Sequence, residues 1–257
     1  MRIALKVSYD GTMFEGWQVQ PGKRTVQGEL ERAAGELFGA PVKVAGSGRT
    51  DSGVHAEGQI CHLDADTQIL ARKIRECLNE RLPEDVRVLK SAEAPEGFDC
   101  TRSAKKKTYR YRFYYAETAL PLLERYAVRV REKPDLLKMQ SAARLYVGEH
   151  DFAAFRAAGG SAKTTVRTIY SAEVSESRQN GAIIYDFVVC GSGFLYHMVR
   201  ILAGQLFAVG CGKKEKESIL SAYRTGDRSL LGKTMAAKGL TMVSVEYDPS
   251  PFPAAEE

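Results

Sequence analysis

Residues 1–10 read MRIALKVSYD, and the alternation within them decides how the chain begins to fold. Ile3, Leu5 and Val7 fall on one face of an extended chain, which is the period of a half-buried β-strand. An Asp-Gly turn signal follows at once. This stretch therefore predicts a strand over residues 2–9 that runs into a loop.

The elements that follow this strand repeat one order. In the first half, the patterns predict a helix, two strands, a helix and a strand at residues 25–38, 42–45, 58–63, 68–81 and 85–92. In the second half they predict a strand, a helix, two strands, a helix and a strand at residues 107–115, 135–147, 165–174, 182–189, 196–210 and 240–247, with a short extra helix at 215–223. Each half thus has the order β-α-β-β-α-β.

This repetition predicts the fold class and the domains. We expect an α+β protein of two pseudo-duplicated split β-α-β halves, similar to ferredoxin or RNA-recognition-motif folds, with the sheets side by side and the helices on one face. The first half would span residues 1–103 and the second half residues 104–257.

Composition and length place the chain among folded globular proteins. Its 257 residues are 44% hydrophobic and 27% charged, which is close to the average of soluble domains. The apolar stretch at residues 201–212 falls well short of the roughly 20 residues that cross a bilayer. The N-terminus lacks an apolar run long enough for a secretory signal. We therefore expect a cytoplasmic protein without a membrane segment.

Cysteine usage argues against disulfides and against zinc. The 5 cysteines are widely spaced, with no C-x-x-C pair, which indicates reduced thiols and excludes the common zinc ribbons and fingers. No phosphate loop of the G-x-x-x-x-G-K-[ST] type occurs either. We therefore expect no cofactor and no metal.

Positive charge gathers in one segment. The whole chain has a net charge of +5, whereas residues 102–112 alone hold six cations and no acid. Two interpretations stay open: a patch that docks a polyanion, and a solvated basic loop.

Residues 44–56, VAGSGRTDSGVHA, form the least ordinary segment of the chain. Three glycines surround Arg49, Thr50 and Asp51 directly after a predicted strand. Because glycine permits close backbone approach, such a loop can hold a carboxylate at a fixed position and still leave room for a substrate. Asp51 could serve as a nucleophile, a general base or a metal ligand. Taken alone, the same pattern also fits a tight turn.

Other signatures match only in part. The glycine spacing at residues 46–48 lacks the third glycine of the dinucleotide fingerprint. His55 and Glu57 match half of a zinc deaminase motif, but no P-C-x-x-C follows. Asp64 and Asp66 resemble the aspartate loop of a metal-dependent phosphatase, yet they lie between strands of a predicted split sheet.

A basic strand with aromatic residues is predicted at residues 107–114. Alternation puts Tyr109, Tyr111 and Phe113 on one face, opposite two arginines. Aromatic rings on a basic strand can stack nucleobases while the cations meet phosphate, whereas fully buried rings would serve only the core.

Arg200 stands one helical turn into the predicted helix that begins near Tyr196. Its surroundings in sequence are apolar, and an Arg near a buried helix end needs an acidic partner. Asp51 is a candidate for that partner.

The chain resembles the tRNA pseudouridine synthase A family over nearly its whole length. The segment that carries the resemblance most specifically is GRTDSGVHA at residues 48–56. Further matching blocks are YDGT (9–12), GWQ (16–18), TVQG (25–28), KTYRY (107–111), GEHDF (148–152), TVRTI (165–169), FLYHMVR (194–200) and KGL (238–240).

The resemblance implies an activity and roles for residues. It implies isomerisation of uridine to pseudouridine in the anticodon stem-loop of tRNA, at positions 38, 39 and 40, by a homodimer that uses no cofactor or metal. Asp51 would be the nucleophile, and Tyr109 would stack on the target base and help to move a proton. Arg200 would pair with Asp51, and Arg49 would help to displace or replace the flipped base.

Two positions depart from the family pattern. Thr101 stands where the family usually has Arg, and Ala236 stands where Pro is frequent.

The alternative function is a non-catalytic RNA-binding protein with two recognition-motif-like halves. Asp51 argues against it, because a carboxylate beside an RNA backbone repels phosphate.

Overall fold

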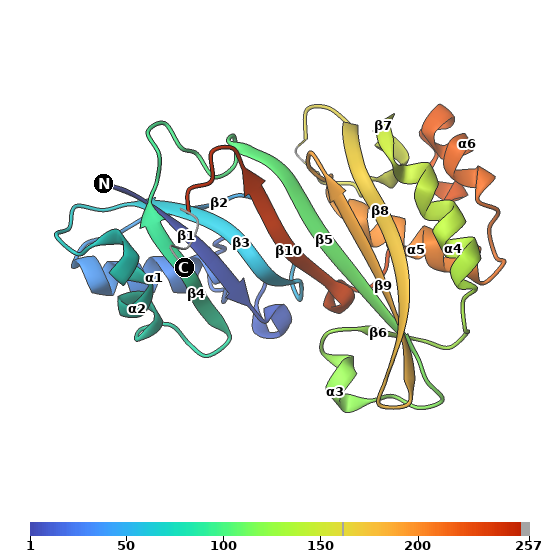
Figure 1. Cartoon of the computed structure of the whole chain (residues 1–257), viewed down its shortest axis with the longest axis horizontal. Coiled ribbons are helices and arrows are strands. Elements are labelled where there is room, and N and C mark those ends of the chain that lie inside the picture. The colour runs from blue at the N-terminus through green and yellow to red at the C-terminus, as the bar shows by residue number, and fades with distance from the viewer. Residues whose placement is uncertain (161, 253–257) are drawn as a thin grey trace. The chain divides into compact units, whose positions relative to one another are not determined.

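The computed structural model describes residues 1–160 and 162–252. The chain divides into two compact units, Met1–Lys107 together with Met242–Glu257, and Thr108–Thr241. The first unit holds the blue and teal segments of Figure 1, and the second unit holds most of the green to orange ones.

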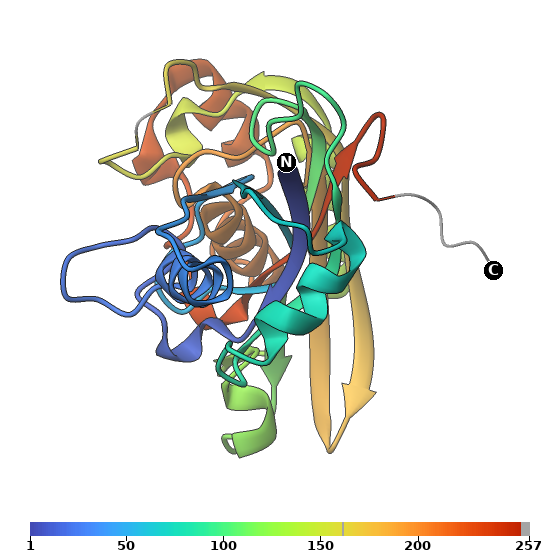
Figure 2. The same ribbon diagram turned by 90° about the vertical axis from the view of Figure 1, so that its left-hand side faces the viewer.

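The first unit is a mainly antiparallel sheet with two helices. Its elements are β1 (Arg2–Tyr9), α1 (Val26–Phe38), β2 (Val44–Gly46), β3 (His55–Asp64), α2 (Ile74–Asn79), β4 (Val86–Glu93) and most of β10 (Leu240–Tyr247). β1 lies between β3 and β4, so that Leu5 faces Cys61 on one side and Ser91 on the other. In Figure 2, α1 is seen nearly end-on.

Local sequence explains how α1 is bounded. The Thr25 hydroxyl accepts a hydrogen bond from the Gly28 N–H at 3.2 Å, and the helix ends at Gly39 in the left-handed conformation. Val26 and Leu30 are buried in the core. The predicted helix therefore forms as expected and turns its apolar stripe inward.

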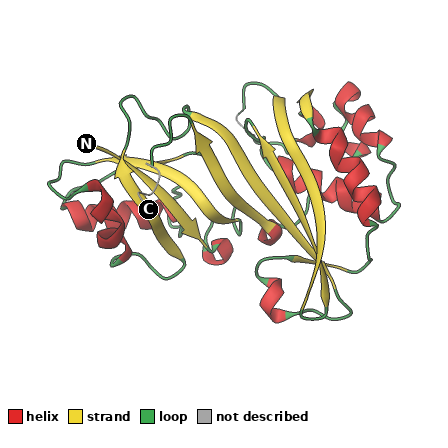
Figure 3. Cartoon of the chain, in the orientation of Figure 1, coloured by secondary structure: helices red, strands yellow, loops and turns green. Residues whose placement is uncertain are grey.

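The second unit has the same kind of architecture. Its elements are most of β5 (Ala104–Tyr115), α3 (Pro121–Glu124), β6 (Val128–Val130), α4 (Leu136–Ala143), β7 (Gly148–Asp151), β8 (Val166–Gln179), β9 (Ala182–Gly191), α5 (Met198–Gly210) and α6 (Glu217–Thr225). The strand order is β5-β9-β8-β7, and β6 pairs parallel with β5. The helices α4, α5 and α6 lie to one side of β8 and β9 (Figure 3).

Single turns of 3₁₀ helix link several of these elements. They are Gly11–Met13, Ala71–Lys73, Arg144–Tyr146, Ala153–Phe155, Arg228–Leu230 and Ala237–Gly239. The helix predicted over residues 68–81 is therefore split into a 3₁₀ turn and the shorter α2.

The predicted fold class is confirmed by the matching order of strands in the two units. In the first unit β1, β3 and β2 are neighbours, and in the second unit β5, β9 and β8 are neighbours. Each set consists of the first, third and second strand of a β-α-β-β-α-β half. The two halves are pseudo-repeats of one α+β pattern.

The compact units differ from the predicted halves at the C-terminus. The prediction placed residues 240–257 in the second half, whereas Met242–Glu257 belongs to the first unit, where β10 lies beside β3. β2 pairs with β3 only at residues 61–63, because β2 has three residues. The remainder of that edge of β3 is thus available for β10.

No helix within residues 1–160 and 162–252 combines the length and the apolar character needed to cross a membrane.

Candidate active site

Asp51 lies in the loop of residues 47–54, which connects β2 to β3 and is called here the Asp51 loop. Asp51 is half-buried, Arg49 is exposed and Thr50 is buried. The Val54 N–H donates to the Asp51 carbonyl at 3.1 Å and closes a turn. Asp51 is therefore the first residue of a turn and is partly accessible to solvent.

The segment that follows β1 holds this loop from one side. The Trp17 N–H donates to the Thr50 carbonyl at 3.0 Å, and the Gly53 N–H donates to the Phe14 carbonyl at 3.3 Å. Gly16 has φ +87°, and a β-carbon there would lie 2.7 Å from the Thr50 carbonyl oxygen. Only glycine fits this position, because it tolerates both the left-handed backbone and the close approach.

The start of β3 is fixed in the same way. A β-carbon on Gly11 would lie 2.0 Å from the Val54 carbonyl oxygen, so glycine is required there too. The Gly11 N–H donates to Nδ1 of the buried His55 at 3.0 Å. The same Nδ1 lies 3.2 Å from a carboxylate oxygen of Asp10. His55 thus supports the loop.

Polar side chains hold the beginning of the Asp51 loop. The Gln59 amide in β3 donates from Nε2 to the Gly48 carbonyl at 2.7 Å and accepts from the Ser47 hydroxyl. Nζ of Lys107 donates to the Ser47 carbonyl at 2.6 Å. Sequence reasoning missed Gln59, although an amide inside an otherwise apolar stretch of strand was a visible signal.

Thr101, one of the two departures from the family pattern, also supports this region. Its hydroxyl donates to the Gly46 carbonyl at 3.0 Å, and the neighbouring Cys100 thiol contacts the Ala45 carbonyl at 3.1 Å. Both contacts hold β2 just before the Asp51 loop begins.

Tyr109 belongs to the second unit and is buried, as are Tyr111 and Phe113 on the same face of β5. The Tyr109 ring packs edge-on against Phe194, with ring centroids 5.1 Å apart and planes at 80°. The alternation expected from the sequence is thus confirmed. Tyr109 is held by an aromatic contact.

Arg200 also belongs to the second unit, on α5. Its Nε donates to the Met235 carbonyl at 2.7 Å, and the Met235 N–H donates to the Arg200 carbonyl at 3.2 Å. Burial raises the pKa of the nearby Tyr111 hydroxyl, an effect that the Arg200 charge opposes. Of the predicted site residues, the structure therefore places Asp51 and Arg49 on one loop of the first unit, and Tyr109 and Arg200 in the second unit.

Several cations of the basic segment have protein partners. The Arg112 guanidinium donates to both carboxylate oxygens of Asp186 at 2.8 and 2.9 Å, and Arg110 lies 3.8 Å from the same carboxylate. Arg102 pairs with Asp99 at 3.1 Å. Ion pairs within the protein thus neutralise part of the positive charge of this segment. The side chain of Lys105 is exposed.

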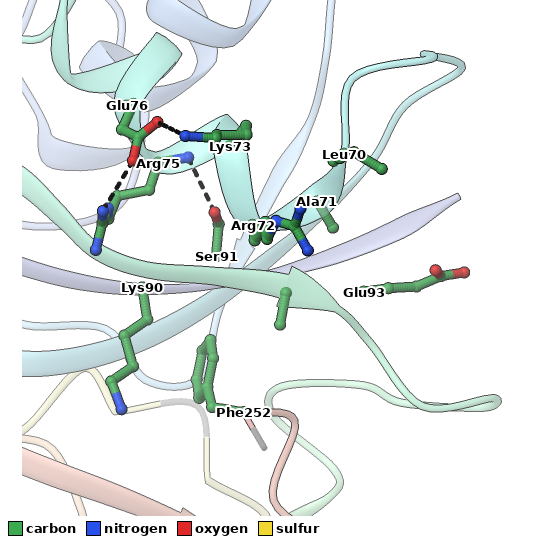
Figure 4. Close-up of a pocket in the computed structure, with 11 residues that line it drawn as sticks. Leu70, Ala71, Arg72, Lys73, Arg75, Glu76, Lys90, Ser91, Glu93 and Phe252 are labelled. Carbon is green, nitrogen blue, oxygen red and sulfur yellow. Dashed lines mark hydrogen bonds and ion pairs between the residues drawn. The ribbon is translucent and has the colours of Figure 1, made fainter. Parts of the chain in front are cut away.

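A pocket of about 540 Å³ lies elsewhere in the first unit, beside α2 and β4 (Figure 4). Arg72, Lys73, Arg75 and Lys90 line it, but Glu76 pairs with Lys73 at 3.1 Å and with Arg75 at 3.0 Å. None of its lining residues belongs to the Asp51 loop. In the part of the chain that the structure describes, no group of three or more His, Cys, Asp or Glu residues is placed to hold a metal ion.

Comparison with known proteins identifies the family. The model of a family described as tRNA pseudouridine synthase matches residues 5–101 and 142–248. tRNA pseudouridine synthase A of Ruminiclostridium cellulolyticum is 42% identical over 246 residues, which cover 96% of this chain and 99% of that protein. The protein of the same name from Bacillus subtilis (strain 168) is 41% identical over 251 residues, which cover 96% of this chain and 100% of that protein.

The repeated α+β halves, the carboxylate on a fixed loop and these similarities define the class: the chain is an enzyme, a pseudouridine synthase, and pseudouridine synthases are isomerases. More particularly, it belongs to the tRNA pseudouridine synthase family.

Proposed function

We propose that this enzyme isomerises uridine to pseudouridine in the anticodon stem-loop of tRNA, at positions 38, 39 and 40, with Asp51 as the nucleophile. The observation that carries the proposal is the Asp51 loop itself. Hydrogen bonds from Trp17 and to Phe14 fix its backbone, and two glycines permit the close packing. A carboxylate held in this way is preorganised for one reaction geometry.

The reaction moves a base without changing its composition. Asp51 attacks C1′ while the bond from C1′ to N1 of the uracil breaks. The detached base turns, its C5 attacks C1′, and the carboxylate is released. The proton on C5 leaves, and N1 gains a proton, so atoms and charge balance. The enzyme must therefore hold a base that has left both its stack and its sugar.

The other predicted residues take roles around this step. Tyr109 stacks on the target base and helps to move the proton from C5. Arg200 pairs with the Asp51 carboxylate. Arg49 lies two residues before Asp51 and, being exposed, is available to occupy the space that the flipped base leaves. Support for these three roles comes from the family motifs around each residue.

The chain acts on tRNA as a homodimer in the cytoplasm, needing no cofactor or metal. The family resemblance supports the homodimer and the independence from cofactor and metal, and the lack of an apparent signal or membrane segment in the sequence supports the location. Light scattering tests the homodimer, because one chain has a mass of 28.4 kDa and a dimer would have twice that molar mass in solution. Assays in excess EDTA decide the independence from metal.

Asp51→Asn tests the nucleophile directly. We expect the variant to fold and to bind tRNA with unchanged Kd, but to lose at least about 1,000-fold in the single-turnover rate constant, because an amide is a poor nucleophile. The measurement is release of tritium from tRNA labelled at C5 of uridine, since that hydrogen leaves during the reaction. A folded Asn variant with a near wild-type rate would refute the role of Asp51.

A further inference from the structure

The amide of Gln59 has an unusual position for a polar group. It lies in β3 with 0% of its surface exposed, and both ends of the amide bind the Asp51 loop. Nε2 donates to the Gly48 carbonyl at 2.7 Å, and Oε1 accepts from the Ser47 hydroxyl. A buried amide that is satisfied by two adjacent residues of a loop restrains that loop strongly, because breaking either bond leaves a buried polar group unpaired.

A second buried contact extends the restraint to the residue before Asp51. The Tyr9 and Thr50 hydroxyls lie 2.8 Å apart, and both residues are buried. Burial raises the pKa of the Tyr9 hydroxyl, which hydrogen bonds with Thr50 and Gln59 oppose. Tyr9 therefore stays neutral at ordinary pH, and the polar row runs from Gln59 through Tyr9 to Thr50.

Toward the Asp51 loop, the side chain at position 59 needs one donor and one acceptor. The Gly48 carbonyl can only accept, and the Ser47 hydroxyl is used here as a donor. A carboxylate at position 59 would offer two acceptors and would repel the Gly48 carbonyl. A protonated carboxylic acid would again offer one donor and one acceptor. The amide is thus matched to these two partners.

We infer that Gln59 is a positioning residue for the reaction: it sets the backbone of residues 47–50, and through it the orientation of the Asp51 carboxylate. It touches neither the reacting atoms nor the substrate in this role. The inference rests on the proposed function of Asp51 and adds to it a residue that the motif GRTDSGVHA does not contain.

Gln59→Glu tests the inference through pH. Burial raises the pKa of a carboxyl group, and the Lys107 ammonium on the Ser47 carbonyl opposes this rise. The Glu side chain is protonated at low pH and binds both partners as the amide does. As the pH rises through that pKa, ionisation displaces the loop. We expect a single-turnover rate constant close to wild type at low pH that falls by about 10- to 100-fold as the carboxyl ionises, with tRNA Kd unchanged. The wild-type enzyme should lack this fall.

Gln140→Glu is the matched control. Gln140 is half-buried on α4, and its Nε2 donates to the Val174 carbonyl at 2.9 Å, so the same substitution breaks the same kind of bond in the second unit. Its pH profile should follow the wild type. If the Gln59→Glu profile also follows the wild type while Asp51→Asn is inactive, the inference about Gln59 is wrong and the proposed function stands. If Asp51→Asn is active, the proposed function itself has failed.

Gln59→Met provides a second test of the positioning role in case the Glu variant unfolds at high pH. Met is similar in length and supplies neither the donor nor the acceptor. We expect a rate constant that is reduced at every pH, without a new ionisation and with unchanged tRNA Kd. A folded Met variant that reacts at the wild-type rate would overturn the positioning role.

Discussion

At the scale of single residues, hydrogen bonds from several parts of the first unit hold the Asp51 loop. Trp17 and Phe14 bind it from the segment after β1, Gln59 binds it from β3, and the Lys107 ammonium binds its Ser47 carbonyl. Substituting either Gly11 or Gly16 would force this backbone apart. This arrangement explains why the YDGT and GWQ blocks accompany GRTDSGVHA in the sequence: the segment that contains them packs against the Asp51 loop.

Tyr109→Phe separates stacking from proton transfer. The substitution keeps the ring and its edge-on contact with Phe194, and it removes only the hydroxyl. If the hydroxyl moves a proton, we expect the single-turnover rate constant to fall by about 100-fold or more with tRNA Kd unchanged. Tyr111→Phe is the control: it removes a 2.7 Å hydrogen bond to the Ala236 carbonyl and should cost about 1 kcal/mol of stability. A Tyr109→Phe enzyme that reacts at the wild-type rate would limit Tyr109 to stacking.

The candidate site residues come from motifs that the sequence displays, whereas tertiary contacts have no such signal in the sequence. Asp51, Arg49, Tyr109 and Arg200 all lie in blocks that the sequence displays. The contact of Lys107 with the Ser47 carbonyl joins residues 60 positions apart, and no local pattern encodes it. Lys107 is one of the six cations of residues 102–112 that the sequence offers for docking a polyanion, whereas the structure gives its ammonium a partner in the Asp51 loop.

At the scale of elements, the beginning of β5 is where RNA contacts can be tested. Lys105 and Lys106 are exposed, and Lys106 pairs with Glu246 at 3.9 Å. If both lysines meet phosphate, Lys105→Ala with Lys106→Ala should weaken binding of every tRNA by a similar factor. The slope of log K against log salt should fall by about 0.7 to 0.9 per contact.

Titration of this double variant across several salt concentrations decides between a docking patch and a solvated strand end. The single-turnover rate constant at saturating tRNA should stay near wild type, since neither lysine is placed in the reaction. An unchanged Kd and an unchanged slope would mean that these lysines do not contact the RNA.

Long strands with clear periodicity were predictable, whereas several short elements were not. β1 and β10 occupy the residues that their alternation predicts, 2–9 and 240–247. The short elements α3, β6 and β7 were missed, because three or four residues carry too little periodicity to distinguish them from loops. β6 forms only by pairing with β5, which is a tertiary condition.

At the scale of the whole molecule, two pseudo-repeated halves carry different parts of the proposed chemistry. Asp51 and Arg49 belong to the first unit, and Tyr109 and Arg200 belong to the second. The repeated order β-α-β-β-α-β was predictable from the sequence. The position of β10 in the first unit was not, because it depends on how much of one edge of β3 the short β2 leaves unpaired. A non-catalytic RNA-binding protein would not need a rigid loop that presents a carboxylate.

Mapping pseudouridine in tRNA after incubation with the purified enzyme tests the central claim most directly. A chemical adduct on pseudouridine stops a primer extension one residue before each modified site. We predict stops for positions 38, 39 and 40 of tRNAs that have uridine there when the wild-type enzyme is used, and none with Asp51→Asn. Stops confined to other positions, or the same stops with the Asn variant, would contradict the account.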